Sequence, residues 1–167
     1  MKNLLFLITY ILMASCNDET KNQSASSKLD PILKQHMVDS MVNNTIKDAI
    51  LKDTISLADC PVEILSSKPI KKEYSNYKSI YVSYKNISHK TITAIRFKWY
   101  GVNAFNEPAD MGSISNGIGG GFADDMLKPG KSDSGEWNIL SRDLKKVIKA
   151  WAYEVAFEDG TKWKAGE

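Results

Sequence analysis

Carboxylate side chains gather between residues 106 and 134, and such groups can hydrolyse a bond or bind a hard cation. The cation candidates are Asp110, Asp124, Asp125 and Asp133, and a hydrolase would use acidic residues of 106–134 together with Asp159 or Glu158. Two carboxylates about 5 to 10 Å apart in one cleft would suit glycoside hydrolysis, and several carboxylate oxygens would suit calcium. The spacing matches no EF-hand loop, so solvated carboxylates are the favoured interpretation and a hydrolase is the alternative.

The thiol of Cys16 is another reactive group, and it follows a short apolar segment at the N-terminus. The run from Leu4 to Ala14 covers about 11 residues, whereas a membrane-spanning helix needs about 20, so we expect an export signal that is removed. Met13-Ala14-Ser15-Cys16 resembles the lipobox of bacterial lipoproteins. The resemblance implies cleavage of residues 1–15 and acylation of the Cys16 thiol, and several acyl chains anchor a protein stably in a membrane. The expected location is the cell envelope, at the outer membrane, facing either the periplasm or the outside.

Two further features are similar to signals of exported bacterial proteins. The acidic pair Asp18-Glu19 follows the cysteine closely, as in signals for surface export. Asp39-Ser40-Met41 and Asp53-Thr54-Ile55 resemble short O-glycosylation signals. They imply hexose on Ser40 and Thr54.

The remaining cysteine and the histidines offer little chemistry. The chain has two cysteines, so with lipid on Cys16 the other, Cys60, has no disulfide partner within the chain. Free cysteine usually behaves as a small buried hydrophobe, which is our expectation for Cys60. His36 and His89 fall in different predicted elements and make no ligand pair at metal spacing. We expect neither a metal nor another cofactor.

Charge and motif spacing argue against nucleic-acid and nucleotide partners. The chain carries 22 Lys and Arg against 20 Asp and Glu, and this near-neutral balance attracts nucleic acid weakly. Gly130-Lys131-Ser132 is similar to the end of a phosphate-binding loop, but Asp125 stands where that motif needs glycine. The glycine-rich residues 117–121 lack the surroundings of a dinucleotide fingerprint. They favour a loop, or a strand start where backbones approach closely.

Aromatic and cationic side chains alternate on the predicted strands and indicate a binding face. Tyr81, Arg96, Lys98 and Tyr100 fall on the phase opposite to the predicted core. Such a face would suit a protein or glycan partner in the envelope, because aromatic rings combine apolar area with a polar tip. The tryptophans mostly fall on the apolar phase, which predicts core packing for Trp99, Trp137, Trp151 and Trp163.

A tether and a helix precede these strands. Residues 16–29 are polar and serine-rich and predict a flexible linker. Asp30-Pro31 suits a helix start, which predicts a helix over residues 30–52. Its two apolar stripes are expected to pack on the following domain, with docking on a partner as the alternative. The stripes are Leu33/Met37/Met41 and Val38/Val42/Ile46.

From residue 54 onward the hydrophobic period becomes two, which indicates strands with one buried and one solvated face. Three clear cases are Ile80/Val82/Tyr84, Ile95/Phe97/Trp99 and Trp151/Tyr153/Val155/Phe157. Lys128-Pro129-Gly130-Lys131 is a turn signal, and Asp159-Gly160 is a strong hairpin signal. Residues 54–167 therefore predict about seven strands in two packed antiparallel sheets. The expected strands are 55–65, 78–86, 91–105, 121–127, 134–140, 147–158 and 161–165.

Four segments resemble small immunoglobulin-like sandwich domains of exported bacterial proteins. They are VSYKN (82–86), TAIRFKWYGVNAFNEP (93–108), LKPGKSDSGEW (127–137) and VAFEDGTKW (155–163). The resemblance spans residues 60–165 and implies a mainly β chain, an immunoglobulin-like antiparallel β-sandwich. It brings no set of catalytic residues.

An export signal joined to a domain without an acid–base or nucleophile constellation predicts a non-enzymatic binding module anchored in the envelope by lipid. The hydrolase described above is one alternative. A stabilising subunit of a larger surface complex is the other.

Overall fold

The computed structural model describes residues 30–52, 57–111 and 116–166, and there it contains one helix and seven strands. The elements are α1 (Pro31–Lys52), β1 (Val62–Lys71), β2 (Lys78–Asn86), β3 (Ile92–Val102), β4 (Ile118–Ala123), β5 (Ser132–Asn138), β6 (Lys146–Phe157) and β7 (Lys162–Lys164). The predicted signal, the predicted tether with Cys16, and Thr54 lie outside the described residues.

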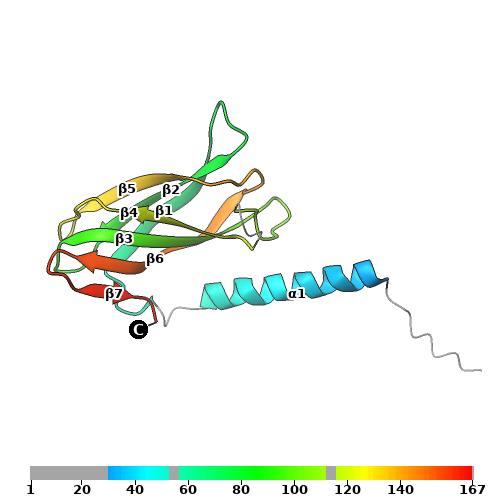
Figure 1. The fold of residues 1–167 in the computed structure, drawn as a ribbon, viewed down its shortest axis with the longest axis horizontal. Helices are drawn as coiled ribbons and strands as arrows, with labels where there is room; N and C mark the ends of the chain where they lie inside the picture. The colour runs from blue at the N-terminus through cyan, green and yellow to red at the C-terminus, as the bar shows by residue number, and fades with distance from the viewer. Residues whose placement is uncertain (1–29, 53–56, 112–115, 167) are drawn as a thin grey trace, which may run out of the picture.

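The strands form two antiparallel sheets that face each other (Figure 1). One sheet has the order β1-β2-β5 and the other the order β4-β3-β6-β7. Rings from both sheets meet between them: the centroids of Tyr84 and Phe97 are 4.8 Å apart, and those of Phe97 and Trp137 are 5.3 Å apart. The prediction of a mainly β chain with two antiparallel sheets is confirmed.

The period-two alternation holds on β2 and β3 and fails on β6. Ile80, Val82, Ile95 and Phe97 are buried as predicted. On β6, however, Glu154 pairs with Arg96 and Ala152 pairs with Phe97, which leaves Tyr153 as an extra residue in the ladder.

Because a bulge of this kind reverses the alternation, Ala152 is fully buried and Trp151 is not part of the core. Instead the ammonium of Lys149 lies 5.4 Å from the Trp151 ring centroid. Core packing is confirmed for Trp99, Trp137 and Trp163 and is wrong for Trp151.

Glycines of β4 make room for the indole rings. A Cβ placed on Gly121 would lie 2.8 Å from Cδ1 of Trp137 and 2.8 Å from Cη2 of Trp99. The Trp137 indole also donates from Nε1 to the carbonyl of Phe122 at 2.9 Å, which ties β5 to β4. The glycine-rich segment is therefore a strand at which a backbone and two rings approach closely, and β4 begins three residues before the predicted start at 121.

The first predicted strand is misplaced. Residues 57–59 form a short helical turn, and β1 runs from Val62 to Lys71 instead of 55–65. Pro69 lies inside β1, and this is tolerated because β1 is at the edge of its sheet, where proline's missing N–H leaves no ladder bond unmade.

Turn residues join the strands in the expected places. Gly130 has φ +74° and the Lys131 N–H donates to the carbonyl of Lys128 at 3.1 Å, as in a Pro-Gly turn of type II. Gly160 has φ +80° in the β6–β7 turn, which confirms the hairpin predicted from Asp159-Gly160.

A buried asparagine holds the turn after β2. The Asn86 side chain is fully buried, and its Nδ2 donates to the carbonyls of Lys90 at 2.8 Å and Leu127 at 2.9 Å. Its Oδ1 accepts from the Ser88 N–H at 2.9 Å. The side chain therefore fastens the β2–β3 turn to the segment between β4 and β5.

The helix forms as predicted but does not pack as predicted. Asp30 Oδ1 accepts from the N–H of Ile32 at 2.9 Å, which caps α1. No residue of α1 is buried, and the stripe of Leu33, Met37 and Met41 is 46–63% exposed. Packing of the Leu33/Met37/Met41 stripe on the sandwich is therefore wrong, and of the second stripe only Ile46 is half-buried.

A different side of α1 turns towards the strands (Figure 1). The half-exposed residues Asn43, Ile46, Lys47 and Ile50 recur at helical spacing. At the end of this stripe the Lys149 ammonium donates to the carbonyl of Ile50 at 2.7 Å. The side of α1 nearest to β6 thus mixes polar and apolar residues, and the Leu33/Met37/Met41 stripe lies outside it.

Candidate functional site

The predicted binding face is divided between the two sheets. Tyr81 lies on β2, where the Lys68 ammonium is 5.4 Å from its ring centroid. Arg96, Lys98 and Tyr100 lie on β3, in the other sheet. Since the outer faces of two packed sheets point in opposite directions, the prediction that Tyr81 shares a face with the other three is wrong.

Arg96 and Lys98 form an open, amphipathic surface on β3. Arg96 Nη1 lies 2.7 Å from Glu154 Oε2, and the Lys98 ammonium lies 4.6 Å from the ring centroid of Tyr153. Phe122, on the neighbouring β4, is 53% exposed and lines a shallow hollow together with Lys98 and Tyr153. Sequence alternation placed Tyr153 in the core and missed this role, because the β6 bulge is a pairing event between strands.

Tyr100 continues the outward row of β3 but is fully buried. Its ring packs so closely on Gly117 that a Cβ there would lie 2.7 Å from Cε2. Within the described part of the chain its hydroxyl is buried and has no hydrogen-bond partner, and burial raises its pKa. The expectation that Tyr100 is exposed is wrong, because the segments on either side of the row cover it.

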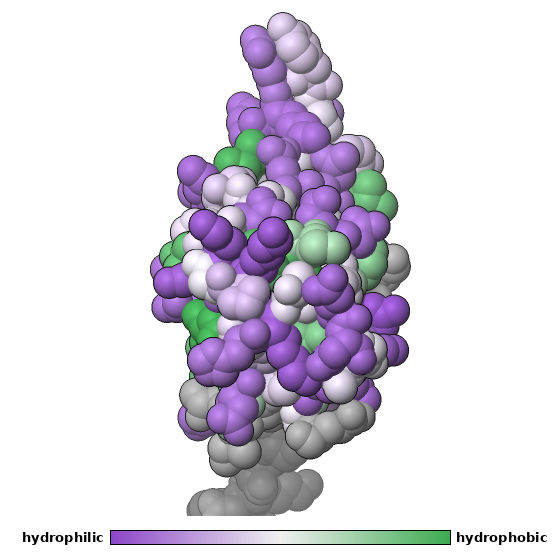
Figure 2. Space-filling view, turned by 90° about the vertical axis from the view of Figure 1, so that its left-hand side faces the viewer, coloured by the Kyte–Doolittle hydropathy of each residue, from purple (hydrophilic) through white to green (hydrophobic). Residues whose placement is uncertain are grey.

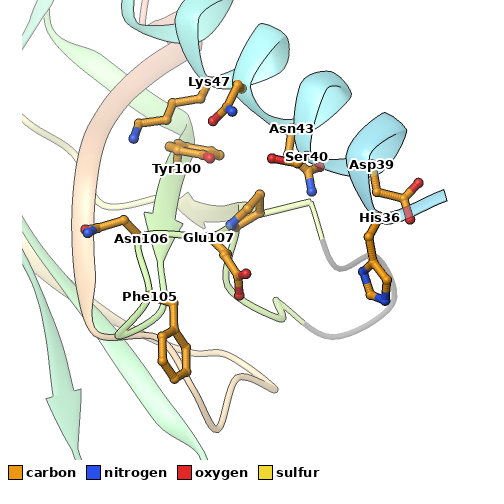
Figure 3. Close-up of a pocket in the computed structure, with 11 residues that line it drawn as sticks. His36, Asp39, Ser40, Asn43, Lys47, Tyr100, Phe105, Asn106 and Glu107 are labelled. Carbon is orange, nitrogen blue, oxygen red and sulfur yellow. The ribbon is translucent and has the colours of Figure 1, made fainter. Parts of the chain in front are cut away.

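Tyr100 lines a pocket of about 530 Å³ between α1 and the loop after β3. Figure 3 shows its ring between the Lys47 side chain of α1 and the loop at Asn106 and Glu107. The two walls come from segments about 60 residues apart in the sequence, so no local motif could have revealed them. The other lining residues are His36, Asp39, Ser40, Asn43, Asn44, Phe105 and Pro108.

The loop wall of the pocket is held in one shape by Asn103. Its Oδ1 accepts from the N–H groups of Phe105 at 2.9 Å and Glu107 at 3.1 Å, and its Nδ2 donates to Glu107 Oε2 at 3.1 Å. The Glu107 carboxylate is thereby fixed, while the phenyl ring of Phe105 is 82% exposed. The pocket therefore combines positioned polar groups with one accessible ring.

Asp110 and Asp159, two candidates of the hydrolase alternative, lie at opposite ends of β3, whereas Asp125 and Asp133 both act on the Tyr84 hydroxyl. Asp159 lies after β6, beside the start of β3, since its Oδ2 is 2.7 Å from the Lys90 ammonium. The N–H of Asp110 donates to Asp143 Oδ1 at 3.0 Å, and its neighbour Ala109 bonds to Gly101 at the far end of β3. A strand of that length separates the two ends by about 30 Å. Of the acidic residues in 106–134, Glu107 lines the pocket, and neither Glu158 nor Asp159 does.

The Asp159 carboxylate stabilises the β6–β7 turn through its hydrogen bond with Thr161 and its ion pair with Lys90. The hydrogen bond from Lys90 lowers its carboxyl pKa most, and those from the Thr161 hydroxyl and N–H add to the shift. The surface at the end carrying this turn is mainly hydrophilic, with hydrophobic residues in small separate patches (Figure 2). Solvated carboxylates, the favoured interpretation, fit this end of the molecule.

Other acidic and nucleophilic groups have local partners. The Tyr84 hydroxyl lies 3.5 Å from Asp133 Oδ2, and burial first, then the charge of Asp133, raises its pKa. The Cys60 thiol donates to the carbonyl of Val62 at 3.2 Å, and burial raises its pKa. Cys60 also packs against the core, which agrees with a structural role.

The predicted modification and ligand residues occupy different settings. Ser40 and His36 are exposed on α1 and line the pocket, whereas His89 is exposed in the turn after β2. Among the described residues, no group of three or more His, Cys, Asp and Glu is arranged to hold a metal ion. In the same part of the chain, no helix has the length and apolar character needed to cross a membrane.

Comparisons with known proteins give no functional assignment. No family model and no curated protein matches the chain. One solved structure that resembles it is a hypothetical protein from Peptoclostridium difficile 630, with 13% sequence identity and a TM-score of 0.46. The match covers 65% of this chain and 88% of that one.

Proposed function

We propose that this chain is a non-enzymatic binding module, anchored in the cell envelope by lipid on Cys16, and that its binding surface is the outward row of β3. The observation that carries the binding role is that this row leads from the open pair Arg96–Lys98 to Tyr100, which lines the pocket and whose buried hydroxyl has no partner among the described residues. Buried polar groups are nearly always hydrogen-bonded. A ligand in the pocket would supply the missing bond of Tyr100; the other such atom that the structure describes, Trp99 Nε1, lies against Gly119 of β4.

The strand order supports an immunoglobulin-like fold for this module. If β4 is lettered C′ because it pairs with β3, and the other strands are lettered A, B, C, E, F and G in chain order, the sheets correspond to A-B-E and C′-C-F-G, without a strand D. Immunoglobulin-type sandwiches divide their strands in this way, with A, B and E in one sheet and C, F and G in the other. The outward row of β3 would then lie on strand C of the larger sheet.

Lipid anchoring is supported by the sequence around Cys16 and is testable by mass. Native protein extracted from membranes should begin at Cys16 and carry acyl chains, and a Cys16→Ser variant should appear in the soluble fraction. An uncut N-terminus, or membrane retention of the variant equal to the parent, would overturn the anchor. The same spectra test hexose on peptides containing Ser40 or Thr54.

The binding role is testable by site-specific photo-crosslinking in cells that make the protein. p-Benzoylphenylalanine would replace Phe122, on the proposed surface, or Tyr81, which supplies a matched aromatic position on the opposite sheet. We expect a discrete crosslinked envelope component from position 122 and none from position 81. Crosslinks of equal yield from both positions, or from neither while a control lipoprotein is captured by its partner, would overturn the proposal.

A further inference from the structure

The pocket between α1 and the loop after β3 has the lining of a site for a polyhydroxylated ligand. Its walls carry the amide side chains of Asn43, Asn44 and Asn106 and the hydroxyl of Ser40. These groups both donate and accept hydrogen bonds. A ligand with many hydroxyls, which also donate and accept, could satisfy several of them at once.

The charges around the pocket disfavour an anion. Asp39 and Glu107 contribute two carboxylates, whereas Lys47 contributes one ammonium. Phosphate and carboxylate ligands are normally bound by clusters of Arg and Lys or by backbone N–H groups. Carboxylates accept hydrogen bonds from the hydroxyl groups of a neutral ligand. The hydrogen bond from Asn103 Nδ2 holds the Glu107 carboxylate in a fixed position.

An independent observation is the buried hydroxyl of Tyr100. It lies against the pocket with no partner among the described residues, although the residue is fully buried. A buried hydroxyl without a partner destabilises the folded chain. It would gain one if a hydroxyl of a bound ligand reached the inner end of the pocket.

The exposed ring of Phe105 adds an aromatic surface to the polar groups that line the pocket. Phe105 is 82% exposed although it belongs to a loop whose backbone is fixed by Asn103. An aromatic face can cover the apolar C–H side of a sugar ring while the hydroxyls at its rim reach polar groups. The pocket volume of about 530 Å³ lies in the usual range of roughly 300 to 1,000 Å³ for small-ligand sites.

We infer that this pocket binds a saccharide unit that carries no net negative charge. The inference rests on the binding role proposed above and names the class of its ligand. The ring stacks on Phe105, its hydroxyls bond to the asparagines and to Glu107, and one of them reaches Tyr100. An oligosaccharide would extend from the pocket along the row towards Lys98.

The test uses the full mature chain in detergent on an array of neutral, amino and uronic oligosaccharides, with positive compounds measured by calorimetry. Phe105→Ala and Tyr100→Phe should each weaken binding about tenfold, the effect of one contact or hydrogen bond. Matched controls outside both the pocket and the β3 surface are Tyr74→Ala, at an exposed ring, and Tyr81→Phe, on the opposite sheet, and each should bind within about twofold of the parent. Phe105 is exposed, so its variant keeps the fold.

Three results would overturn the inference. They are an array without a bound saccharide, preference for uronic acids or competition by inorganic phosphate, and an equal loss of affinity in the Tyr74 and Tyr81 controls. If no saccharide binds while position 122 still crosslinks an envelope component, the ligand class is wrong and the binding role stands. If crosslinking fails but the array shows pocket-dependent saccharide binding, the sheet surface is wrong and the pocket stands.

Discussion

Replacing Tyr100 by phenylalanine should make the unliganded protein more stable. The ring is fully buried and its hydroxyl has no partner within the described residues, so folding removes the hydroxyl from water without a compensating bond. That desolvation costs about 1 to 3 kcal/mol. The phenyl ring of the variant keeps the contact with Gly117 and loses only the small contact energy of one oxygen atom.

The expected net gain for Tyr100→Phe is about 1 kcal/mol in the free energy of unfolding. For a domain of this size that corresponds to a rise in melting temperature of about 3 to 5 °C. Urea titration and thermal scans of the parent and the variant measure both quantities. The gain should disappear in the presence of a ligand that bonds to the hydroxyl.

Tyr84→Phe is the matched control because the Tyr84 hydroxyl is close to Asp133 Oδ2, at 3.5 Å. It should lose about 0.5 to 1 kcal/mol, the usual net value of one hydrogen bond. If Tyr100→Phe lost as much as this control, the Tyr100 hydroxyl would be bonded in the free protein. The structural basis for a ligand at that position would then be gone.

Three further changes test the packing, hydrogen bonds and charges of the sandwich. Gly121→Ala should lower the free energy of unfolding by about 1 to 3 kcal/mol, because the new methyl group meets the Trp137 ring; Gly130→Ala has open space and should show only backbone strain, so equal urea midpoints would contradict the packing described. Asn86→Leu should cost about 2 to 3 kcal/mol, because the turn loses the hydrogen bonds of the Asn86 amide to Lys90, Leu127 and Ser88; an unchanged melting temperature would argue against those bonds. The carboxyl pKa of Asp159 is lower in the folded than in the unfolded chain, so its contribution is complete above about pH 4 and falls as the pH drops towards the folded value. Asp159→Asn should flatten the loss of stability in acid titrations, and identical acid profiles would refute this assignment.

Local signals in the sequence predicted the parts of the fold that depend on neighbouring residues. Asp30-Pro31 gave the helix start, and Pro129-Gly130 and Asp159-Gly160 gave two turns, because each sets the backbone angles of its own position. Alternation on β2 and β3 predicted the core residues Ile80 and Phe97, since a strand without a bulge keeps a period of two.

Residues distant in sequence decided the site. Whether Tyr81 shares a surface with Arg96 depends on the sheet that each strand joins, and alternation within a strand carries no information on its neighbours. The outward position of Tyr153 comes from the pairing of β6 with β3, and the burial of Tyr100 comes from segments outside its own strand.

The sequence by itself thus determined the strands, the turns and the inward side of the regular strands, because these follow from backbone preference and hydrophobic period. Only the tertiary structure decided which side chains meet on one surface and that α1 forms one wall of a pocket. Long-range strand pairing and helix placement minimise the free energy of the whole chain, and no short segment contains the terms that settle them.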